Sequence, residues 1–538
     1  MTANGTTINF GWFSTKVSYD GEGCAEFHDP AGIVKGRAYV NFDEFGQSRI
    51  EMNIDEVVTE HPLQMGLMEL FSGSKPVKTE QGLSLPIGGL QNACTKLTVS
   101  SDKGEFSASQ GLHYGYSLGA RGDNSKQLTF HPLGAEFKAS NSGEPCYWVM
   151  PLSNFISRFI AQHPAVDAHV LRLAGQDNRE SATKQPAILF EFGDGFGFIE
   201  PLPDYEERES NLKEGRERHC ITALMIGEIG SNETEGDKLY DWLPFDFLRL
   251  LSFATGTTVG SPWIELRSKT GDLVRRIHRN YELEPFSRGH QTIDELIHSG
   301  SGYLLTRYQE CADRGQAFLS VALKHVIQGG SYDGSIEDTT VYLCRALDGL
   351  CDRYGFKSQN LLKELDTVKE KEITDILVAA KQQIRAAASK ARKEGLLDQS
   401  RAMERIAERV RSNAANKDVD FGLAVAGLLK RFDLPDADIL DTHYQNAPRP
   451  DGIQTWSGVI SHYRGTTMHR GHYEISGKKH DFDDVLRIND HLLDILIRII
   501  FKIVGYDGSY QPPMVKATTR EEVGWLKPDL PASRLGYE

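Results

Sequence analysis

The spacing of apolar residues changes along this chain, and that change restricts most strongly how it can fold. Up to about residue 205, apolar and polar residues alternate in short runs; Ile50, Met52 and Ile54, for example, are separated by polar residues. Alternation with a period of two is typical of strands with one buried face. From about residue 290 onward, apolar residues recur every three to four positions, which is the period of a helix. The sequence therefore predicts an antiparallel β-rich part followed by an all-α part.

Two places in the first part have the pattern of a β-hairpin. The turn-like Phe45-Gly46-Gln47 lies between apolar runs at 39–42 and 50–54. Gly193-Asp194-Gly195 also lies between two short apolar runs, and glycine next to aspartate is favoured in tight turns. Many short strands joined by Gly-rich turns favour a sandwich-like antiparallel sheet or a barrel.

The chain is too long for one compact core, since single cores stop growing at about 250–300 residues. Charged stretches with few apolar residues at 204–217 and 228–238 indicate a boundary. A helix candidate at 242–251 and a strand candidate at 263–266 follow it. We therefore expect an α+β multidomain protein with a sensor-like β-rich domain, a mixed connecting segment, a helical domain and a non-helical tail: residues 1–235, 236–290, 291–508 and 509–538.

Two long helices are predicted within the helical part. The first has apolar residues along one face: Ile373, Ile376, Leu377, Ala380, Ile384, Ala387 and Ala391. The last helix of the chain repeats this pattern with Val485, Leu492, Leu496, Ile499 and Ile503. Asp483 and Asp484 at its start suit the positive end of the helix dipole.

The overall composition argues against several classes of protein. The formal net charge is −15, so any nucleic-acid-binding face has to be a local basic patch. The first residues lack a basic region followed by an apolar run, which argues against a secretory signal. The apolar stretch 492–504 is interrupted by charged residues, and the seven cysteines contain no Cys-x-x-Cys pair. We expect a cytoplasmic protein without a membrane anchor, a zinc ribbon or a disulfide framework.

A basic segment in the helical part is a candidate nucleic-acid-binding surface. Residues 381–417 carry ten basic and four acidic side chains, a local excess of six positive charges in an acidic chain. The candidate binding residues are Arg385, Lys390, Arg392, Lys393, Arg401, Arg405 and Arg409. The alternative is a solvated helix face with ion pairs three residues apart, such as Arg401 with Glu404.

Near the C-terminus, Arg464 and His469 form an Arg-x4-His motif within the densest cluster of candidate catalytic groups in the chain. Arginine is always charged and binds phosphate, whereas histidine gains or loses a proton near neutral pH. The spacing alone is not specific, because Arg158 and His163 repeat it in the β-rich part. The motif therefore needs support from its surroundings.

The local structure expected around Arg464 and His469 limits what one copy of the motif can do. We expect a helix that begins near Ile453 and ends at Gly471, a residue type favoured just after a helix. Five residues along an ideal helix are about 140° and about 7.5 Å apart, so the two side chains do not share a face. Both can bind one phosphate only if the helix ends or distorts, which Gly465 permits, or if two copies of the motif meet in a dimer.

The segment Arg464–Tyr473 resembles the Arg-x4-6-His signature of HEPN domains, in particular those of ApeA-type anti-phage proteins. In that family a β-rich N-terminal domain precedes a C-terminal helical HEPN domain, which is the order expected here. Further similarity lies in short stretches: residues 250–256 with Pro262-Trp263, residues 342–350 and residues 469–473. The family usually has a polar residue directly after the arginine. Here that residue is Gly465, and Thr466 or Thr467 would have to supply the missing hydrogen bond.

The resemblance implies metal-independent RNA cleavage in anti-phage defence by abortive infection. Attack of a 2′-hydroxyl on phosphorus needs a base, an acid and positive charge near the phosphorane. His469 would act as general acid or base and Arg464 would stabilise the phosphate, and a homodimer would bring two of each to one composite site. Candidate supporting residues are Thr466, Thr467, His472 and Asp348, the last either as a partner that orients Arg464 or as a solvent-exposed helix residue. No cofactor is expected, and the expected partners are RNA (tRNA or mRNA), a second copy and a phage-derived trigger.

Two other interpretations stay open. Four histidines near the motif could hold a metal ion: His462, His469, His472 and His480. No carboxylate or cysteine has a matching spacing, however. The helical domain could also be a non-catalytic HEPN-like module that binds nucleic acid or protein, with Arg464 and His469 retained for structure.

Overall fold

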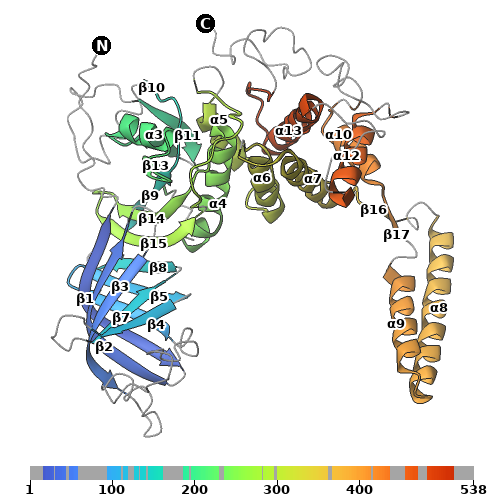
Figure 1. Cartoon of the computed structure of the whole chain (residues 1–538), viewed down its shortest axis with the longest axis horizontal. Helices are drawn as coiled ribbons and strands as arrows, with labels where there is room; N and C mark the ends of the chain where they lie inside the picture. The colour runs from blue at the N-terminus through green and yellow to red at the C-terminus, as the bar shows by residue number, and fades with distance from the viewer. Residues whose placement is uncertain are drawn as a thin grey trace.

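The protein is an α+β structure in which a large antiparallel sheet is followed by helices (Figure 1). The computed structural model describes residues 16–28, 31–43, 48–58, 94–110, 113–118, 126–132, 134–140, 143–161, 186–192, 195–229, 236–281, 283–295, 300–331, 333–360, 366–412, 416–434, 436, 453, 455–470 and 482–513. The order of a β-rich part and a helical part agrees with the change of period along the sequence.

Fifteen of the described strands form one sheet in the order β10-β11-β12-β13-β9-β14-β15-β8-β5-β4-β1-β2-β3-β7-β6. One half comes from the first part of the chain: β1 (Val17–His28), β2 (Ala31–Phe42), β3 (Ser48–Val58), β4 (Cys94–Ser101), β5 (Gly104–Gln110), β6 (His113–Leu118), β7 (Lys126–His131) and β8 (Gly134–Ala139). The other half follows in the chain: β9 (Pro145–Ser153), β10 (Ile160–Ala161), β11 (Pro186–Phe192), β12 (Gly195–Pro201), β13 (Ile221–Glu228), β14 (Ser261–Ser268) and β15 (Leu273–Tyr281).

Both predicted hairpins are confirmed. Strands β2 and β3 pair antiparallel with Val40 opposite Ile50, and both of these side chains are fully buried. Strands β11 and β12 pair antiparallel from Ile188 opposite Ile199 to Phe192 opposite Gly195. In β2, β3 and β11 the alternation of apolar and polar residues places one face in a core, whereas residues 197–200 of β12 are buried on both faces.

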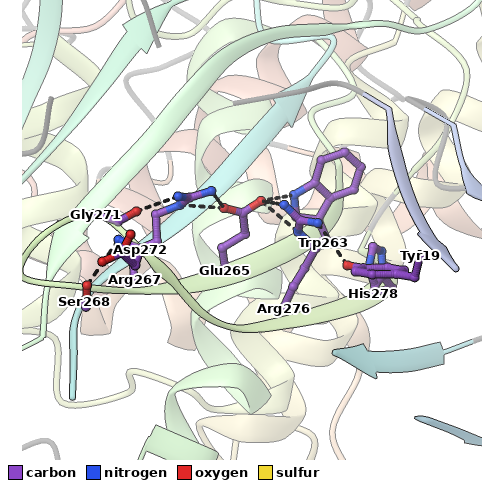
Figure 2. A network of polar contacts seen from close by, with 9 residues as sticks. All are labelled: Tyr19, Trp263, Glu265, Arg267, Ser268, Gly271, Asp272, Arg276 and His278. Carbon is purple, nitrogen blue, oxygen red and sulfur yellow. Dashed lines mark hydrogen bonds and ion pairs between the residues drawn. The ribbon is translucent and has the colours of Figure 1, made fainter. Parts of the chain in front are cut away.

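The half of the sheet that ends at β6 curls around a second core, to which β9, β12, β13 and β14 also contribute side chains. Tyr19 of β1 and Arg276 of β15 are separated by three strands in the sheet order, yet Arg276 Nη1 donates a hydrogen bond of 2.9 Å to the Tyr19 hydroxyl (Figure 2). The rings of Phe42 on β2 and His278 on β15 stack with centroids 3.5 Å apart. Strands β1 and β2 therefore face β15 across this core.

A buried ionic network ties the two sides of this core together (Figure 2). Glu265 is fully buried, and its carboxylate accepts hydrogen bonds from Arg267 Nε at 2.8 Å, Arg276 Nε at 2.8 Å and Trp263 Nε1 at 3.0 Å. Burial by itself would raise the pKa of Glu265, but Arg276 and Arg267 outweigh burial and lower the pKa below its ordinary value. The carboxylate is therefore ionised and is held by two charged partners.

The other half of the sheet shares its core with the helices. Helix α4 (Gly236–Thr255) packs on this half, with the ring of Phe247 5.8 Å from that of Phe190 on β11. Helix α5 (Gly300–Gln309) lies against β11 so closely that a Cβ at Gly302 would come within 1.9 Å of the Leu189 carbonyl oxygen. One hydrophobic cluster extends from Trp148 of the sheet into the helical part. The sheet and the helices are thus joined by a continuous core.

The mixed segment 236–290 is not a separate connector. Its strands β14 and β15 lie in the sheet between β9 and β8, where they join the two halves. Every residue of β14 is buried, so this strand lacks the alternation that marks a half-exposed strand. The period of the sequence therefore does not reveal that this segment completes the sheet.

The remaining helices are α3 (Tyr205–Lys213), α6 (Ala317–Gly329), α7 (Ile336–Arg353), α8 (Thr367–Lys393), α9 (Leu397–Ser412), α10 (Phe421–Arg431), α12 (Trp456–Arg470) and α13 (Phe482–Val504). Short strands β16 (Ser358–Asn360) and β17 (Asn416–Asp418) pair at the base of the α8–α9 hairpin. The predicted last helix is α13, and its Leu492, Leu496 and Ile499 are at most 1% exposed. No helix in the described ranges is long and apolar enough to cross a membrane.

Helix α8 has the predicted period, but only its last part has a buried face. Ile373 and Ile376 are 39% and 56% exposed, whereas Ala388 and Ala391 are at most 6% exposed. Figure 1 shows the reason: α8 pairs with the shorter α9 in a hairpin that stands away from the other helices. The apolar pattern marks one side of the helix, and tertiary structure leaves part of that side uncovered.

Candidate functional site

Helix α12 carries the Arg-x4-His motif and continues without a break through both motif positions. Asp436 holds its start, because the Asp436 carboxylate accepts hydrogen bonds of 2.7 Å from the backbone N–H and from the hydroxyl of Ser457. The helix begins three residues after the expected Ile453. Gly465 is helical, so the helix does not distort to bring Arg464 and His469 to one phosphate.

One face of α12 is buried and fixes the orientation of the helix. Five residues of this face are at most 4% exposed: Trp456, Val459, Ile460, Tyr463 and Thr467. Their spacing of three and four residues is that of a helical stripe. Arg464 follows Tyr463 and therefore lies at the edge of the stripe, where its side chain is 32% exposed.

Arg464 is held between three helices. Its Nη2 lies 3.8 Å from Oδ1 of Asp348 on α7, so the two residues form an ion pair. Its guanidinium carbon lies 4.4 Å from the centre of the Phe421 ring at the start of α10, which is the geometry of a cation–π contact. Asp348, the candidate partner of Arg464, thus lies beside it.

Asp348 is shared between two cations. Lys357 Nζ donates a hydrogen bond of 2.6 Å to Asp348 Oδ2, the oxygen that does not face Arg464. The three charges sum to one net positive charge on a partly exposed surface. That sign favours contact with a phosphate.

Two thiols lie under this surface. Burial raises the pKa of Cys344 to about 12 and the pKa of Cys351 to about 12. Both thiols therefore stay protonated near neutral pH, and neither is an activated nucleophile.

Of the two threonines considered as substitutes for the missing polar residue, only Thr467 has a described side chain. Thr467 is 4% exposed, and its hydroxyl is buried with no hydrogen-bond partner among the described residues. It lies on the buried stripe of α12, three residues after Arg464. The Thr466 side chain lies outside the described part of the structure.

The histidines of the motif are only partly described. His469 occupies the second-last position of α12, but its side chain is outside the described part, and so is the whole of His472. On the continuous helix the Cα atoms of Arg464 and His469 are separated by a rotation of about 140°. Since the helix neither ends nor distorts between the two residues, a shared phosphate would require two copies of the motif to meet in a dimer.

The candidate binding residues of the α8–α9 hairpin are exposed and only weakly paired. Those with described side chains are Arg385, Lys390, Arg392, Lys393, Arg401 and Arg405; the Arg409 side chain is not described. Lys390 with Glu394, and Arg392 with Glu404, are paired at 4.0 and 3.9 Å. Exposed pairs of this length contribute about 0–1 kcal/mol each. The surface thus has both the basic excess and the ion pairs of the alternative interpretation.

Within one chain the basic hairpin does not border the motif. Figure 1 shows α8 and α9 extending away from α10 and α12, joined to them through β16 and β17. The two groups of candidate residues are thus separate surfaces of the chain.

On this hairpin Arg401 forms its ion pair with Asp398, at 3.8 Å, and not with Glu404 as the alternative interpretation expected.

Lys357 and Phe421 contact the site without any motif that would indicate them. Lys357 follows the end of α7 at Arg353, and Phe421 is the first residue of α10. The one local signal is Asp420, which caps α10 by accepting a hydrogen bond from Gly422 N at 2.9 Å. This capping residue predicts where α10 begins, but it does not predict that Phe421 contacts Arg464.

Among the described residues, no three His, Cys, Asp or Glu side chains are close enough together to hold a metal ion. Three of the four histidines considered for metal binding, His469, His472 and His480, have side chains outside that part of the chain. The fourth, His462, is described on α12.

No protein family model, no curated protein and no solved structure matches this chain. The similarity to HEPN domains therefore rests on the motif residues and on the order of the two parts of the chain.

Proposed function

We propose that this chain is a HEPN-type endoribonuclease that cleaves RNA without a metal ion and acts as a homodimer. The observation that carries the proposal is the setting of Arg464. Its guanidinium is held by Asp348 and Phe421 at the edge of a buried helix face, with a third of the side chain exposed. An arginine in this position can reach a phosphate without losing its support from the protein.

In the proposed reaction the 2′-hydroxyl of one nucleotide attacks the adjacent phosphorus. A P–O bond forms to the 2′-oxygen, the bond to the 5′-oxygen breaks, and a 2′,3′-cyclic phosphate and a 5′-hydroxyl result. One His469 removes the 2′-hydroxyl proton, and a second protonates the leaving 5′-oxygen, with a contribution of about 10²–10⁴ in rate for each. Arg464 stabilises the negative charge that develops on the phosphorane.

The continuous α12 supports a composite site. Because the Cα positions of Arg464 and His469 are about 140° apart around one continuous helix, the two positions do not share a helical face that could meet one phosphate. Two copies related by a twofold axis would supply two histidines and two arginines. The basic α8–α9 hairpin would attract RNA to the assembly, since its excess of positive charge opposes the acidic chain.

The continuous core supports a role of the sheet in control. The cluster around Trp148 in the sheet continues through α4 to Leu347 on α7, the residue before Asp348. In the proposed anti-phage role, a phage-derived trigger binds the β-rich part and the change reaches α7 through this core. Abortive infection as the setting rests on the resemblance to ApeA-type proteins.

A second candidate function is a non-catalytic HEPN-like module that binds nucleic acid or a partner protein. The observation that favours it is the set of contacts of Arg464, because an ion pair to α7 and a cation–π contact to α10 also fasten α12 to its neighbours. In this case Arg464 stabilises the fold, and the basic hairpin does the binding.

The decisive experiment is cleavage of labelled tRNA and mRNA by the purified full-length protein, with His469→Ala as the variant. We expect cleavage with a chelator present, 2′,3′-cyclic phosphate at the new ends, and no cleavage of RNA with 2′-O-methyl groups. His469→Ala should lower the rate about 10²–10⁴-fold without changing the thermal midpoint or the mass of the dimer. His131→Ala, which removes an exposed histidine on β7, is the matched control and should cleave as the parent does.

Three results would count against the nuclease. Cleavage that stops when the chelator is added contradicts the metal-free reaction. Cleavage that His469→Ala leaves unchanged removes the catalytic role of that residue. RNA binding without cleavage by the wild-type dimer supports the second candidate.

A further inference from the structure

A cavity of about 430 Å³ lies between helices α4 and α6, away from the Arg464 motif. Its walls are the C-terminal end of α4, the segment 284–292 that follows β15, and the C-terminal end of α6 with the residues after it. Tyr342 of α7 and Leu493 of α13 complete them. The volume is within the range of ligand pockets, about 300–1,000 Å³. The proposed nuclease reaction does not use it.

The charged groups of the lining are acidic. Glu284 and Asp333 line the cavity, and both are exposed residues that solvent can reach. Among the described residues that line it there is no lysine or arginine. Asp333 Oδ2 accepts a hydrogen bond of 2.8 Å from Ser287, so this carboxylate is held in place at the wall. An anionic ligand would therefore meet two like charges.

His290 adds a neutral acceptor to the same lining. Its Nε2 lies 2.7 Å from the backbone oxygen of Gln511, which can only accept, so Nε2 carries the hydrogen. Nδ1 is then left with a lone pair. Burial lowers the pKa of His290 to about 4, against a smaller effect of the Gln511 hydrogen bond, so the ring is uncharged at neutral pH.

The rest of the wall has a large apolar share. Phe253 and Val326 are at most 3% exposed, Leu493 is 5% exposed, and Ile327 packs beside them. Apolar walls with a few fixed polar groups are typical of sites for small organic molecules. The lining thus combines an apolar wall with two carboxylates and a ring nitrogen that accept hydrogen bonds.

We propose that this cavity binds a small organic cation, an amine that is protonated at neutral pH and carries an apolar ring or chain. The ammonium group lies at the acidic rim with Glu284 and Asp333, and the apolar body lies against Phe253 and Leu493. The inference does not depend on the proposed nuclease activity.

Three cations lie near the cavity without lining it: Arg249, Lys324 and Arg288, whose guanidinium carbon lies 6.0 Å from the centre of the Phe286 ring. Arg249 and Lys324 line a smaller adjoining cavity of about 30 Å³, which has room for little more than a water molecule. Arg249 already donates a hydrogen bond to the Ser320 hydroxyl. Five residues line both cavities: Ser252, Thr258, Glu284, Ile327 and Gln328. None of the three cations is among the residues that line the main cavity.

The test compares three probes that share one ring and differ in the charge of the head group: tryptamine, tryptophol and indole-3-propionate. Their binding to the full-length protein is measured by titration calorimetry at pH 7. We expect tryptamine to bind at least about tenfold more tightly than tryptophol and indole-3-propionate to bind most weakly, because each carboxylate attracts the ammonium and repels the acid. The advantage of tryptamine should shrink when salt is raised from about 0.05 to about 0.5 M.

Variants then locate the site. Glu284→Gln together with Asp333→Asn removes both charges and keeps the shapes, and should reduce the preference for tryptamine over tryptophol about tenfold. Glu105→Gln, at an exposed carboxylate on β5, is the control and should keep the preference. The salt comparison on the wild-type protein serves as the test if the double variant fails to fold. The proposal is overturned if indole-3-propionate binds as tightly as tryptamine, if none of the probes binds, or if the double variant keeps the full preference.

Discussion

Replacing Glu200 by glutamine is expected to stabilise the folded protein above neutral pH and to leave its stability nearly unchanged near pH 4.5. Glu200 lies on β12 and is 1% exposed. Both of its carboxylate oxygens are buried without a hydrogen-bond partner among the described residues. Phe198 and Leu202, two positions away on either side, belong to the hydrophobic core, so the carboxyl group lies on an apolar face.

The size of the effect follows from the pKa of this group. Burial raises the pKa of Glu200 from its ordinary value of 4.5 to about 8. The folded state binds the proton of Glu200 more tightly than the unfolded state does. The contribution of this proton to the free energy of unfolding is therefore complete below pH 4.5 and is lost as the pH rises from 4.5 through 8. At about 1.4 kcal/mol per pH unit, the loss is about 3 kcal/mol at pH 7 and about 5 kcal/mol above pH 8.

The assay is urea unfolding of the wild-type protein and of Glu200→Gln at several pH values between 5 and 9, followed by tryptophan fluorescence. The difference in the free energy of unfolding between the two proteins should grow by about 1.4 kcal/mol for each pH unit up to about pH 8 and then level off. Glu105→Gln, at an exposed position on β5, should show no such trend. A difference that is the same at pH 5 and pH 8.5 would refute the argument, since it would mean that Glu200 is not protonated in the folded state.

Three further variants test other parts of the structure. Glu265→Gln should lower the free energy of unfolding by about 3–5 kcal/mol in the same urea assay, because it leaves the charges of Arg267 and Arg276 buried without their counter-ion. Asp348→Asn should lower the kcat of RNA cleavage about tenfold without raising KM, because it removes the acid that holds Arg464 and not a group that binds RNA. Charge reversal of the exposed arginines of α9 (Arg401→Glu with Arg405→Glu) should weaken RNA binding and reduce the slope of log affinity against log salt, measured by fluorescence anisotropy. An unchanged slope would show that the hairpin does not contact phosphates.

The amino-acid sequence by itself determined the local structure. The period of two around Ile50 predicts β3, the Gly-rich turn at 193–195 predicts the β11–β12 hairpin, and the spacing around Leu492 predicts α13. These features depend on residues that are close in the chain, so a short window contains the information. The same reasoning predicts that Arg464 and His469 do not share a helical face.

Only the tertiary structure decided which of these elements meet. Strand β14 pairs with β9 because its fully buried residues complete the sheet, and no period in its sequence marks that neighbour. Asp348 meets Arg464 because α7 and α12 pack side by side. The apolar side of α8 is left partly exposed because the α8–α9 hairpin stands away from the helical core. The spacing of apolar residues identifies which face of a helix or strand is buried. Which element covers that face depends on segments far away in the chain, whose surfaces must fit it.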